Sequence, residues 1–255
     1  MRSAIAGRAA ARQPCVRGDV LIKVVLLAVL VALGGCANRP RDTTRDPFEA
    51  ANRVTTRFNE AVDSALLKPV ATAYQQITPP LVRTGVSNFF GNVSDVWSLT
   101  NTVLQFKLPE AGDNLMRVLV NTFFGLGGVL DVAGEMRIER HSEDFGQTLG
   151  RWGFATGPYL VLPFYGPSTL RDTLAFGVET RADVVRNLSN VPVRNSLTAL
   201  RAVEVRANLL RATAVLEEAA LDKYTFARDA FLARRRNAIY DGEPPDDELD
   251  AKPPQ

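Results

Sequence analysis

The sequence predicts an all-α protein whose helices are separated by one crossing rich in glycine and proline. In several segments apolar side chains recur every three or four residues, and residues that favour helix starts precede them. Residues 144–172 break this pattern with five glycines and three prolines. Glycine permits left-handed turns and proline lacks an N–H donor, so neither a long helix nor a central strand tolerates this segment. Its best strand candidate, residues 159–165, contains Pro163 and has no evident pairing partner, so we expect a compact, apolar, non-helical crossing.

Composition and charge exclude a basic nucleic-acid-binding protein. The 255 residues suffice for one large domain or two small ones, and 46% of them are hydrophobic, enough for a substantial core. The formal charge of +2 arises from residues 1–35, which hold five basic side chains and one acidic one. The remaining chain has 25 basic and 27 acidic side chains and a net charge of −2. No nucleic-acid partner is therefore expected.

The first 35 residues have the features of a bacterial signal peptide. Residues 24–33 are apolar and uncharged, too short to cross about 30 Å of hydrocarbon but typical of a signal-peptide core. Residues 33–36, Leu-Gly-Gly-Cys, resemble a lipobox, so we expect covalent diacylglycerol and N-acyl lipid on Cys36 and no other cofactor. The alternative is an ordinary buried cysteine after a short apolar helix. Ala37 favours sorting to the outer membrane, because an aspartate there would resemble an inner-membrane retention signal.

The expected chain organisation has four parts. Residues 1–35 form the signal peptide, 36–45 a lipidated tether, 46–242 a helical domain and 243–255 a disordered acidic tail. Residues 1–19 are long for a signal and place Asp19 beside the apolar core. We hypothesise that they are an untranslated extension and that translation starts at Val20 or Leu21.

The helical domain opens with Asp-Pro-Phe-Glu at residues 46–49, which indicates an N-cap, a first-turn proline and a capping-box glutamate. An apolar stripe at helical spacing should run along this helix, with Asn52, Arg53, Asn59, Glu60 and Asp63 mostly on the other side. The stripe consists of Phe48, Ala51, Thr55, Phe58, Val62 and Leu66. Pro69 should end or bend the helix.

Three more helices are expected before the crossing. Residues 78–80, Thr-Pro-Pro, should open a helix towards Phe90. Asn92 or Ser94 should cap the next one, and Pro109 should open the last.

Three further helices are expected after the crossing. Ser168 should cap a helix that carries Leu170, Leu174 and Val178 on one side. Residues 191–192 should separate it from an amphipathic helix starting at Asn195. The apolar positions of that helix are Leu197, Leu200, Val203, Ala207, Leu210 and Ala214. Asp222 should cap a final helix whose Tyr224, Ala227 and Phe231 point inward.

Residues 115–134 form an apolar run with a glycine corner. Its polar members are Arg117, Asn121, Thr122 and Asp131. A continuous helix of this length would reach roughly 30 Å, but each glycine at 125, 127 and 128 costs about 1 kcal/mol in a helix. We expect two short apolar helices that meet at Gly125, Gly127 and Gly128 and lie within one membrane leaflet. The alternative is a buried helical hairpin in an ordinary core.

Charged residues near the expected helices have two interpretations each. Arg171 and Asp172 would either reach lipid headgroups or channel water, or make a surface or local salt bridge. Residues 234–236, three consecutive arginines, complement the dipole at a helix end and would either lie on a solvated face or hold anionic headgroups.

The sequence shows no catalytic or metal-binding constellation. His141 is the one histidine, so no zinc site with ordinary ligand spacing can be assembled, and with Ser142 it indicates a helix-start polar pair. Residues 166–170 lack the last glycine of a nucleophile elbow, and no phosphate-binding loop motif occurs. We therefore expect no enzyme and no metal site.

Short motifs recur in a fixed order along residues 46–242. They are Asp-Pro-Phe-Glu at 46–49, Asn-Arg at 52–53, Phe-Asn at 58–59, Lys-Pro-Val at 68–70, Ser-Asn-Phe at 87–89, Leu-Gln at 104–105, Asn121, Gly-Gly at 127–128, Asp-Val-Ala-Gly at 131–134, the crossing at 144–172, and Tyr-Asp-Gly at 240–242. Each motif is weak alone, but their order and spacing are specific. Together they resemble the MlaA/VacJ family of outer-membrane lipoproteins.

The resemblance implies a single disc- or ring-like helical domain in the inner leaflet of the outer membrane, facing the periplasm. Family members remove misplaced phospholipids from the outer leaflet through an amphipathic channel. They pass the lipid to a periplasmic carrier of the MlaC type and associate with trimeric porins. On this basis Arg117, Asp131, Arg171 and Asp172, with the glycine corner, are candidates for a lipid path or hinge. The competing functions are a structural envelope lipoprotein and a lipid-hydrolysing enzyme, for which one histidine is a poor basis.

Overall fold

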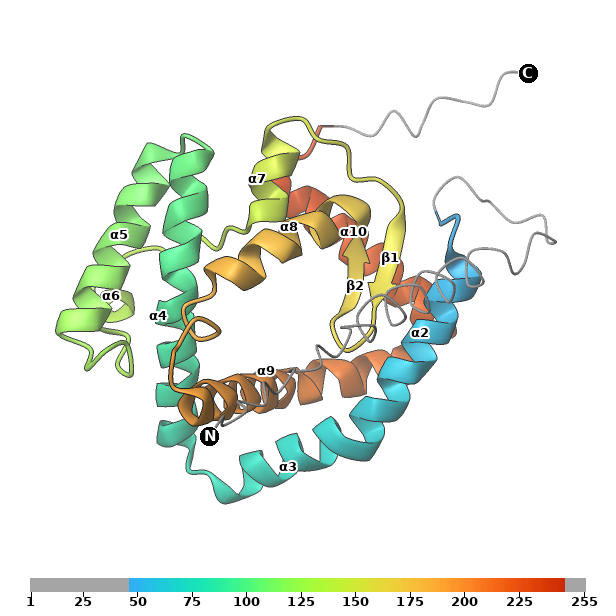
Figure 1. Cartoon of the computed structure of the whole chain (residues 1–255), viewed down its shortest axis with the longest axis horizontal. Helices are drawn as coiled ribbons and strands as arrows, with labels where there is room; N and C mark the ends of the chain where they lie inside the picture. The colour runs from blue at the N-terminus through green and yellow to red at the C-terminus, as the bar shows by residue number, and fades with distance from the viewer. Residues whose placement is uncertain (1–45, 246–255) are drawn as a thin grey trace, which may run out of the picture. The chain divides into compact units, whose positions relative to one another are not determined.

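The computed structural model describes residues 46–245, and most of them are helical (Figure 1). The predicted signal peptide, Cys36, the tether and residues 246–255 of the tail lie outside the described residues. The elements are α2 (Glu49–Val62), the π-helix η1 (Asp63–Leu67), α3 (Lys68–Ile77), α4 (Pro80–Leu104), α5 (Leu108–Phe123), α6 (Val132–Glu135), α7 (Phe145–Arg151), β1 (Tyr159–Leu162), β2 (Gly166–Thr169), α8 (Leu170–Ala182), α9 (Val191–Ala219) and α10 (Lys223–Ile239). The predicted all-α class is confirmed, with one short hairpin added.

Within residues 46–245 most of the helices and strands form a closed circuit in which each one contacts the next. From α2 the chain passes through η1 into α3, which packs along α9, and α9 contacts α4. Then α4 contacts α7, which packs on α8 and α10. The circuit closes through α10 on β2 and β1 on α2, while α5 and α6 lie outside it against α4 and α5 respectively (Figure 1). The ring-like arrangement that the resemblance implies is thus found within residues 46–245.

The first helix starts where predicted, but its expected N-cap has another role. Phe48 is the N-cap residue of α2, and no side chain caps this end. Asp46 is buried instead, and its carboxylate accepts hydrogen bonds from Asn52 at 3.0 Å and from the Tyr224 hydroxyl. The prediction of an Asp46 cap is wrong because these two partners occupy its oxygens.

Pro69 produces the predicted interruption in an unexpected form. It lies in the first turn of α3, directly after the π-helix η1. A proline lacks the N–H donor and crowds the carbonyl four residues earlier, and the wider π turn avoids that conflict. The chain therefore continues from α2 to α3 with a bend.

The helix at residues 80–104 is continuous, so the predicted cap at Asn92 or Ser94 is wrong. Asn92 is buried inside α4, and its Nδ2 donates to Thr122 Oγ1 at 3.1 Å. A partner on α5 thus takes the side chain that would otherwise end a helix. The predicted starts hold, since Pro80 and Pro109 lie in the first turns of α4 and α5.

The crossing at residues 144–172 is less irregular than predicted. It contains α7 and an antiparallel hairpin that pairs Tyr159 with Thr169 and Leu162 with Gly166. Pro163 lies in the three-residue turn between the strands, where its missing donor breaks no ladder bond. The pairing partner of the candidate strand is therefore the next segment of the chain.

The helices after the crossing follow the prediction with shifted starts. Thr169, not Ser168, caps α8 by accepting from Asp172 N at 3.2 Å. Asn190 caps α9, so Pro192 lies in its first turn and does not separate it from the preceding segment. Asp222 caps α10 as predicted, by accepting from Tyr224 N at 3.0 Å.

The side chains of the last two helices largely face as expected. The predicted apolar positions of α9 from Leu197 to Leu210 are buried or half-buried, but Ala214 is exposed. On α10, Tyr224 is buried while Ala227 and Phe231 are half-buried. Tyr224 joins Tyr159 and Val161 in a small apolar cluster against which Phe231 packs.

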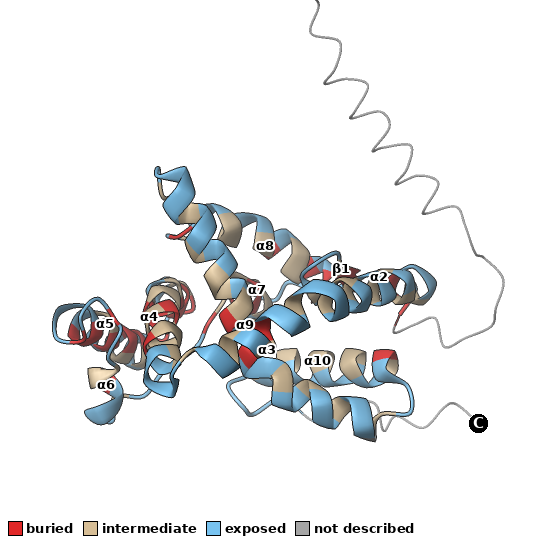
Figure 2. Ribbon diagram, turned by 90° about the horizontal axis from the view of Figure 1, so that it is seen from below, coloured by how far each residue is buried: buried red, intermediate tan, exposed pale blue. Residues whose placement is uncertain are grey.

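Within residues 46–245 the distribution of polar and apolar side chains is the reverse of that in an ordinary globular domain. Most of the described ribbon is exposed or of intermediate burial (Figure 2). Among the described residues more polar and charged side chains than apolar ones are buried, and many large apolar side chains are exposed. The α2 stripe shows the inversion, because Phe58 is 45% exposed and Asn52 only 3%. Most of the apolar stripe of α2 therefore lies on its exposed side.

Two asparagines of α2, the buried Asn52 and the half-buried Asn59, hold the free edge of β1. Asn52 accepts from Val161 N at 2.9 Å and donates to Tyr159 O at 3.0 Å. Two turns further along α2, Asn59 accepts from Phe164 N at 2.8 Å and donates to Leu162 O at 2.9 Å. Side-chain amides thus satisfy backbone groups that a neighbouring strand would otherwise pair.

Candidate functional site

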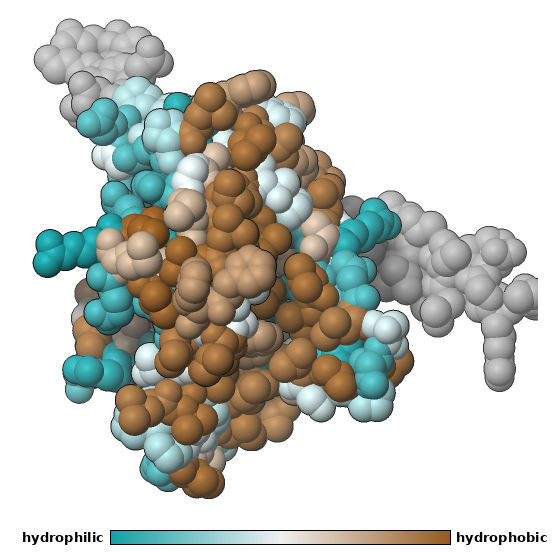
Figure 3. Space-filling model, turned by 90° about the vertical axis from the view of Figure 1, so that its left-hand side faces the viewer, coloured by the Kyte–Doolittle hydropathy of each residue, from teal (hydrophilic) through white to brown (hydrophobic). Residues whose placement is uncertain are grey.

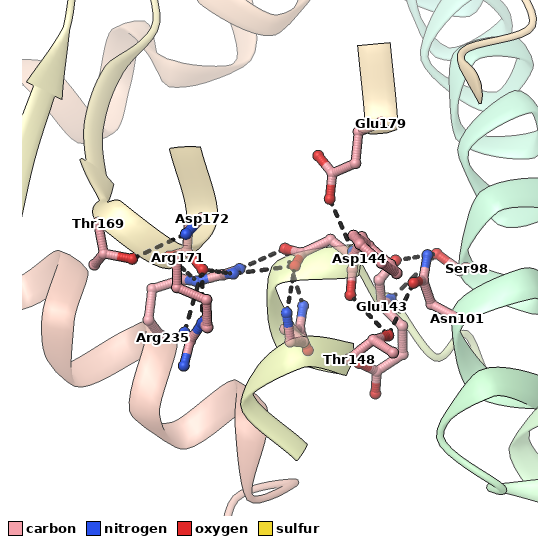
Figure 4. Close-up of polar contacts among 12 residues, drawn as sticks. Ser98, Asn101, Glu143, Asp144, Thr148, Thr169, Arg171, Asp172, Glu179 and Arg235 are labelled. Atoms are coloured by element: carbon pink, nitrogen blue, oxygen red, sulfur yellow. Dashed lines mark hydrogen bonds and ion pairs between the residues drawn. The ribbon is translucent and has the colours of Figure 1, made fainter. Parts of the chain in front are cut away.

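A cluster of charged side chains joins α7, α8 and α10 (Figure 4). Arg235 of α10 lies between Asp144, the N-cap of α7, and Asp172 in the first turn of α8. Its Nη2 is 3.0 Å from Asp144 Oδ1 and 2.8 Å from Asp172 Oδ1, and its Nε is 3.0 Å from Asp172 Oδ2. Burial alone would raise the pKa of Asp144, but the Arg235 guanidinium and the Gln147 N–H outweigh it and lower that pKa. Asp144 is therefore held ionised.

Glu179 of α8 is the acid whose pKa is shifted the other way. It accepts from Phe145 N at 2.8 Å, close to Asp144 (Figure 4). Burial, and next the negative charge of Asp144, raise the pKa of Glu179 above its usual value. Glu179 therefore protonates more readily than Asp144.

Arg171 and Asp172 are brought together in this cluster. Arg171 is buried, and its Nη2 lies 3.2 Å from Asp172 Oδ1, while its Nη1 lies 3.4 Å from Phe154 O. Of the two predicted interpretations, the observed contacts are those of a local ion pair.

A second buried polar network connects α4 to α7. Gln105 Nε2 donates to Glu143 Oε2 at 2.9 Å and to Thr148 Oγ1 at 3.0 Å. Thr148 Oγ1 donates to Asn101 Oδ1 at 2.8 Å, and Lys107 Nζ lies 2.7 Å from Glu143 Oε1. All five side chains are buried, so polar groups occupy the place of an apolar core between these helices.

The glycine corner after α5 has a left-handed backbone. Gly127 and Gly128 have φ of +73° and +94°. A Cβ on Gly128 would lie 2.5 Å from Asn92 Cβ of α4, whereas a Cβ on Gly127 would meet nothing within 4 Å. A Cβ on Gly125 would lie 2.2 Å from Leu130 O. The corner therefore has no room for a Cβ at Gly125 or Gly128.

The second apolar helix expected after the corner is shorter than predicted. The four-residue α6 begins only at Val132, and residues 129–131 form a connecting loop. Asp131 ends that loop and caps α6 by accepting from Gly134 N at 3.1 Å. The corner thus joins one full helix to a single helical turn.

Arg117 and Asp131 meet under this corner. Arg117 is 3% exposed, and its Nη2 lies 2.8 Å from Asp131 Oδ1, which also accepts from Asn121 at 2.8 Å. Asn121 Oδ1 accepts from Ala133 N at 2.8 Å, and Arg117 Nη1 donates to Ile138 O at 2.7 Å. Burial alone would raise the pKa of Asp131, but the Asn121 and Arg117 hydrogen bonds lower it. These contacts fix the corner against α5.

The outer face around the corner is strongly apolar (Figure 3). Apolar side chains gather on the face that includes α5 and the segment after it, and several are about three-quarters exposed. They include Phe106, Leu108, Leu115, Met116, Leu119, Phe123, Phe124, Leu126, Val129, Leu130 and Met136. A patch of this extent marks a surface that contacts another apolar phase or partner. We call it the corner surface.

Residues 46–245 contain neither a membrane-spanning helix nor a metal site. No helix there is both long and apolar enough to cross a membrane. In the same range, no group of His, Cys, Asp and Glu side chains is placed to hold a metal ion. His141 lies in a loop with its Nε2 3.1 Å from Asp113 Oδ2, so its predicted helix-start role is wrong.

A family model described as MlaA lipoprotein matches residues 44–238. The chain belongs to the MlaA lipoprotein family. The match spans the whole circuit of elements from α2 to the last turn of α10.

Individual MlaA relatives are similar to this chain over most of their length. The Escherichia coli (strain K12) protein named intermembrane phospholipid transport system lipoprotein MlaA is 35% identical over 83% of this chain and 86% of the relative. The Haemophilus influenzae protein of the same name is 31% identical over 87% and 92%. A solved structure described as the structural basis for maintenance of bacterial outer membrane lipid asymmetry matches with a TM-score of 0.67 and 32% identity, covering 76% of this chain and 98% of that chain.

The predicted site residues of this MlaA-family chain fall into two groups. Arg117, Asp131 and the three glycines form the corner, whereas Arg171 and Asp172 belong to the cluster around Arg235. Within the described residues no hydrogen bond or ion pair links the two groups. Cys36 lies outside that range.

Sequence reasoning missed the roles of several polar residues that organise the interior. It named Arg235 only within the arginine run 234–236, whereas Arg235 pairs with Asp144 and Asp172 and Arg234 is exposed. The inward position of Arg235 could have been found, because Tyr224, Phe231 and Arg235 are spaced by seven and four residues and share one face of α10. The network around Glu143 and Lys107 had no signal, since its members are scattered along the chain.

Proposed function

We propose that this chain is the outer-membrane lipoprotein of an intermembrane phospholipid transport system. It removes mislocalised phospholipids from the outer leaflet through an amphipathic channel and so maintains lipid asymmetry. It then passes them to a periplasmic carrier of the MlaC type. The relatives that carry this name support the proposal, together with family membership over residues 44–238.

The inverted burial is the structural observation that carries the proposal. An exposed apolar exterior such as the corner surface suits acyl chains, and a polar interior suits a headgroup. Moving a charged headgroup through apolar surroundings is very costly, so a polar route beside hydrocarbon lowers that barrier. In this proposal the corner acts as a hinge at its glycines, braced by Arg117 and Asp131. Arg171 and Asp172 help to line the headgroup route.

Anchoring and partners extend the same proposal. Acyl chains on Cys36 would tether the protein to the outer membrane on its periplasmic side. We propose a trimeric porin as the membrane partner and the MlaC-like carrier as the recipient. No nucleotide-consuming or hydrolytic step is assigned to this chain, and no other cofactor is proposed.

A vesicle assay with two readouts tests the proposed function. The lipidated protein is reconstituted into vesicles, and both phospholipid release to a purified carrier and phospholipid hydrolysis are measured. We expect release without hydrolysis. Hydrolysis would indicate an enzyme instead, and neither activity would favour a structural envelope lipoprotein.

Cys36→Ala should prevent acylation and signal removal at this site. Without thioether-linked lipid the chain should remain uncleaved or reach the wrong compartment, because a short apolar segment alone anchors poorly. Membrane fractionation with intact-mass measurement checks this result. Recovery of mature protein in the outer membrane would disprove the lipobox assignment.

A further inference from the structure

Two adjoining pockets lie on either side of the turn between α9 and α10. The first, of about 430 Å³, lies between α2 and this turn, and the second, of about 590 Å³, continues along α10. Both are lined by Ala220, Leu221 and Asp222. The two pockets adjoin at these three residues, and we call them together the groove, whose two halves differ chemically.

The first half presents charges of both signs from one face of α2. Arg53, Thr56, Arg57 and Glu60 line it at helical spacing, and Lys223 faces them from the start of α10. Arg53 is engaged, because its Nη2 is 2.6 Å from Asp222 Oδ2 and its Nε is 2.8 Å from Glu49 Oε1.

Three of the charged groups in this half have no partner. Arg57, Glu60 and Lys223 make no hydrogen bond or ion pair within residues 46–245. The Asp222 carboxylate is already neutralised by Arg53, which lowers its pKa strongly. Two unengaged cations and one unengaged carboxylate therefore remain for a ligand.

The second half is mainly apolar. Leu221 is fully exposed and Phe226 is half exposed, with Ala230 and Ala233 continuing along the same face of α10. Its acid Asp229 is engaged by Arg228 Nε at 2.9 Å. Removing an exposed leucine side chain from water is favourable, so a ligand that covers Leu221 would gain affinity.

We propose that this groove binds one zwitterionic phospholipid. The phosphate lies between Arg57 and Lys223, and the headgroup ammonium lies against Glu60. An acyl chain passes over Leu221 into the half lined by Phe226 and Ala230. The inference rests on the proposed function and adds a lipid class and a surface site for the transported lipid.

Charge complementarity favours a lipid over a protein segment. Arg57 and Glu60 are three residues apart on one helix, so their Cβ atoms are only about 5–6 Å apart. A phosphate and an ammonium joined through a short linker carry opposite charges at similar spacing, and the attached acyl chain supplies the apolar part. A free phosphate would use the cations alone.

Binding of short-chain lipids to the full-length protein in nanodiscs tests the site. The probes are dihexanoyl-phosphatidylethanolamine, dihexanoyl-phosphatidylglycerol, glycerophosphoethanolamine and inorganic phosphate, each titrated calorimetrically. We expect the first probe to bind tightest and inorganic phosphate at least tenfold more weakly. Equal affinity for phosphate would overturn the lipid assignment and leave a simple anion site.

Variants separate the two halves of the groove. Arg57→Ser with Lys223→Ser should weaken phosphatidylethanolamine binding at least tenfold, and Leu221→Ser several-fold without changing phosphate binding. Glu60→Gln should weaken phosphatidylethanolamine but not phosphatidylglycerol. Arg211→Ser, an exposed arginine of α9 outside the groove, is the matched control and should change nothing.

The outcomes also separate this inference from the proposed function. Normal lipid binding by the Arg57/Lys223 double variant would overturn the inference, even if lipid release in the vesicle assay is normal. Unchanged lipid binding with weakened carrier binding would identify a protein-docking surface instead. A wild-type protein that binds the short-chain lipid here but releases none would contradict the proposed function alone.

Discussion

Gly128→Ala should destabilise the protein and disturb lipid asymmetry more than Gly127→Ala does. Both glycines have positive φ, which costs a residue with a Cβ about 1–2 kcal/mol. The Gly128 methyl group would also lie 2.5 Å from Asn92 Cβ, so α4 or the corner must shift, at a typical cost of about 1–3 kcal/mol. We expect a loss of about 2–5 kcal/mol for Gly128→Ala and only the smaller backbone cost for Gly127→Ala.

Two measurements on each glycine variant distinguish a hinge from simple packing. Denaturant unfolding of the purified protein gives the stability change, and surface-exposed phospholipid in cells gives the functional change at matched abundance. Excess surface phospholipid at normal abundance supports the hinge. If abundance and asymmetry fall together, the glycine only permits close packing, and equal effects of the two variants would refute the steric argument.

Helix positions were predictable because local signals set them. Prolines in the first turns of α3, α4 and α5, and the Asp222 cap of α10, act on neighbouring backbone atoms in any surroundings. The corner at Gly125, Gly127 and Gly128 followed from the same local reasoning. The cap at Asn92 failed because a contact with Thr122, 30 residues away, decides its role.

The orientation of the helices was not predictable in the same way. Periodicity separates the two faces of α2, but it does not say which face meets the interior. Asn52 and Asn59 face inward because the exposed backbone of β1 needs hydrogen-bond partners, and the side that carries Phe58 is left outside. The usual rule that apolar side chains lie inside assumes that water surrounds the protein. The rule is reversed where the outer surface contacts acyl chains, as we propose for this chain.

Arg235→Met should cost about 3 kcal/mol of unfolding free energy at pH 7, among the largest effects of a single substitution here. Removing one partner of a buried ion pair leaves the other charge uncompensated, at a typical cost of 3–5 kcal/mol. The low end applies because 33% of the Asp144 side chain reaches solvent, whereas Asp172 is only 12% exposed. Arg234→Met is the matched control, because Arg234 is exposed and has no partner within residues 46–245.

The difference between Arg235→Met and the wild type should shrink in acid. In the wild type the pKa of Asp144 lies below its ordinary value, so its stabilising contribution is present above about pH 4 and is lost as the pH falls through the folded-state pKa. In the variant, burial is no longer opposed by the guanidinium, so the Asp144 pKa should rise and protonation should relieve the unpaired charge. Denaturant unfolding at pH 7 and pH 4 measures both effects. A difference that stays constant between the two pH values, or an equal loss in Arg234→Met, would show that Arg235 contributes packing and not charge pairing.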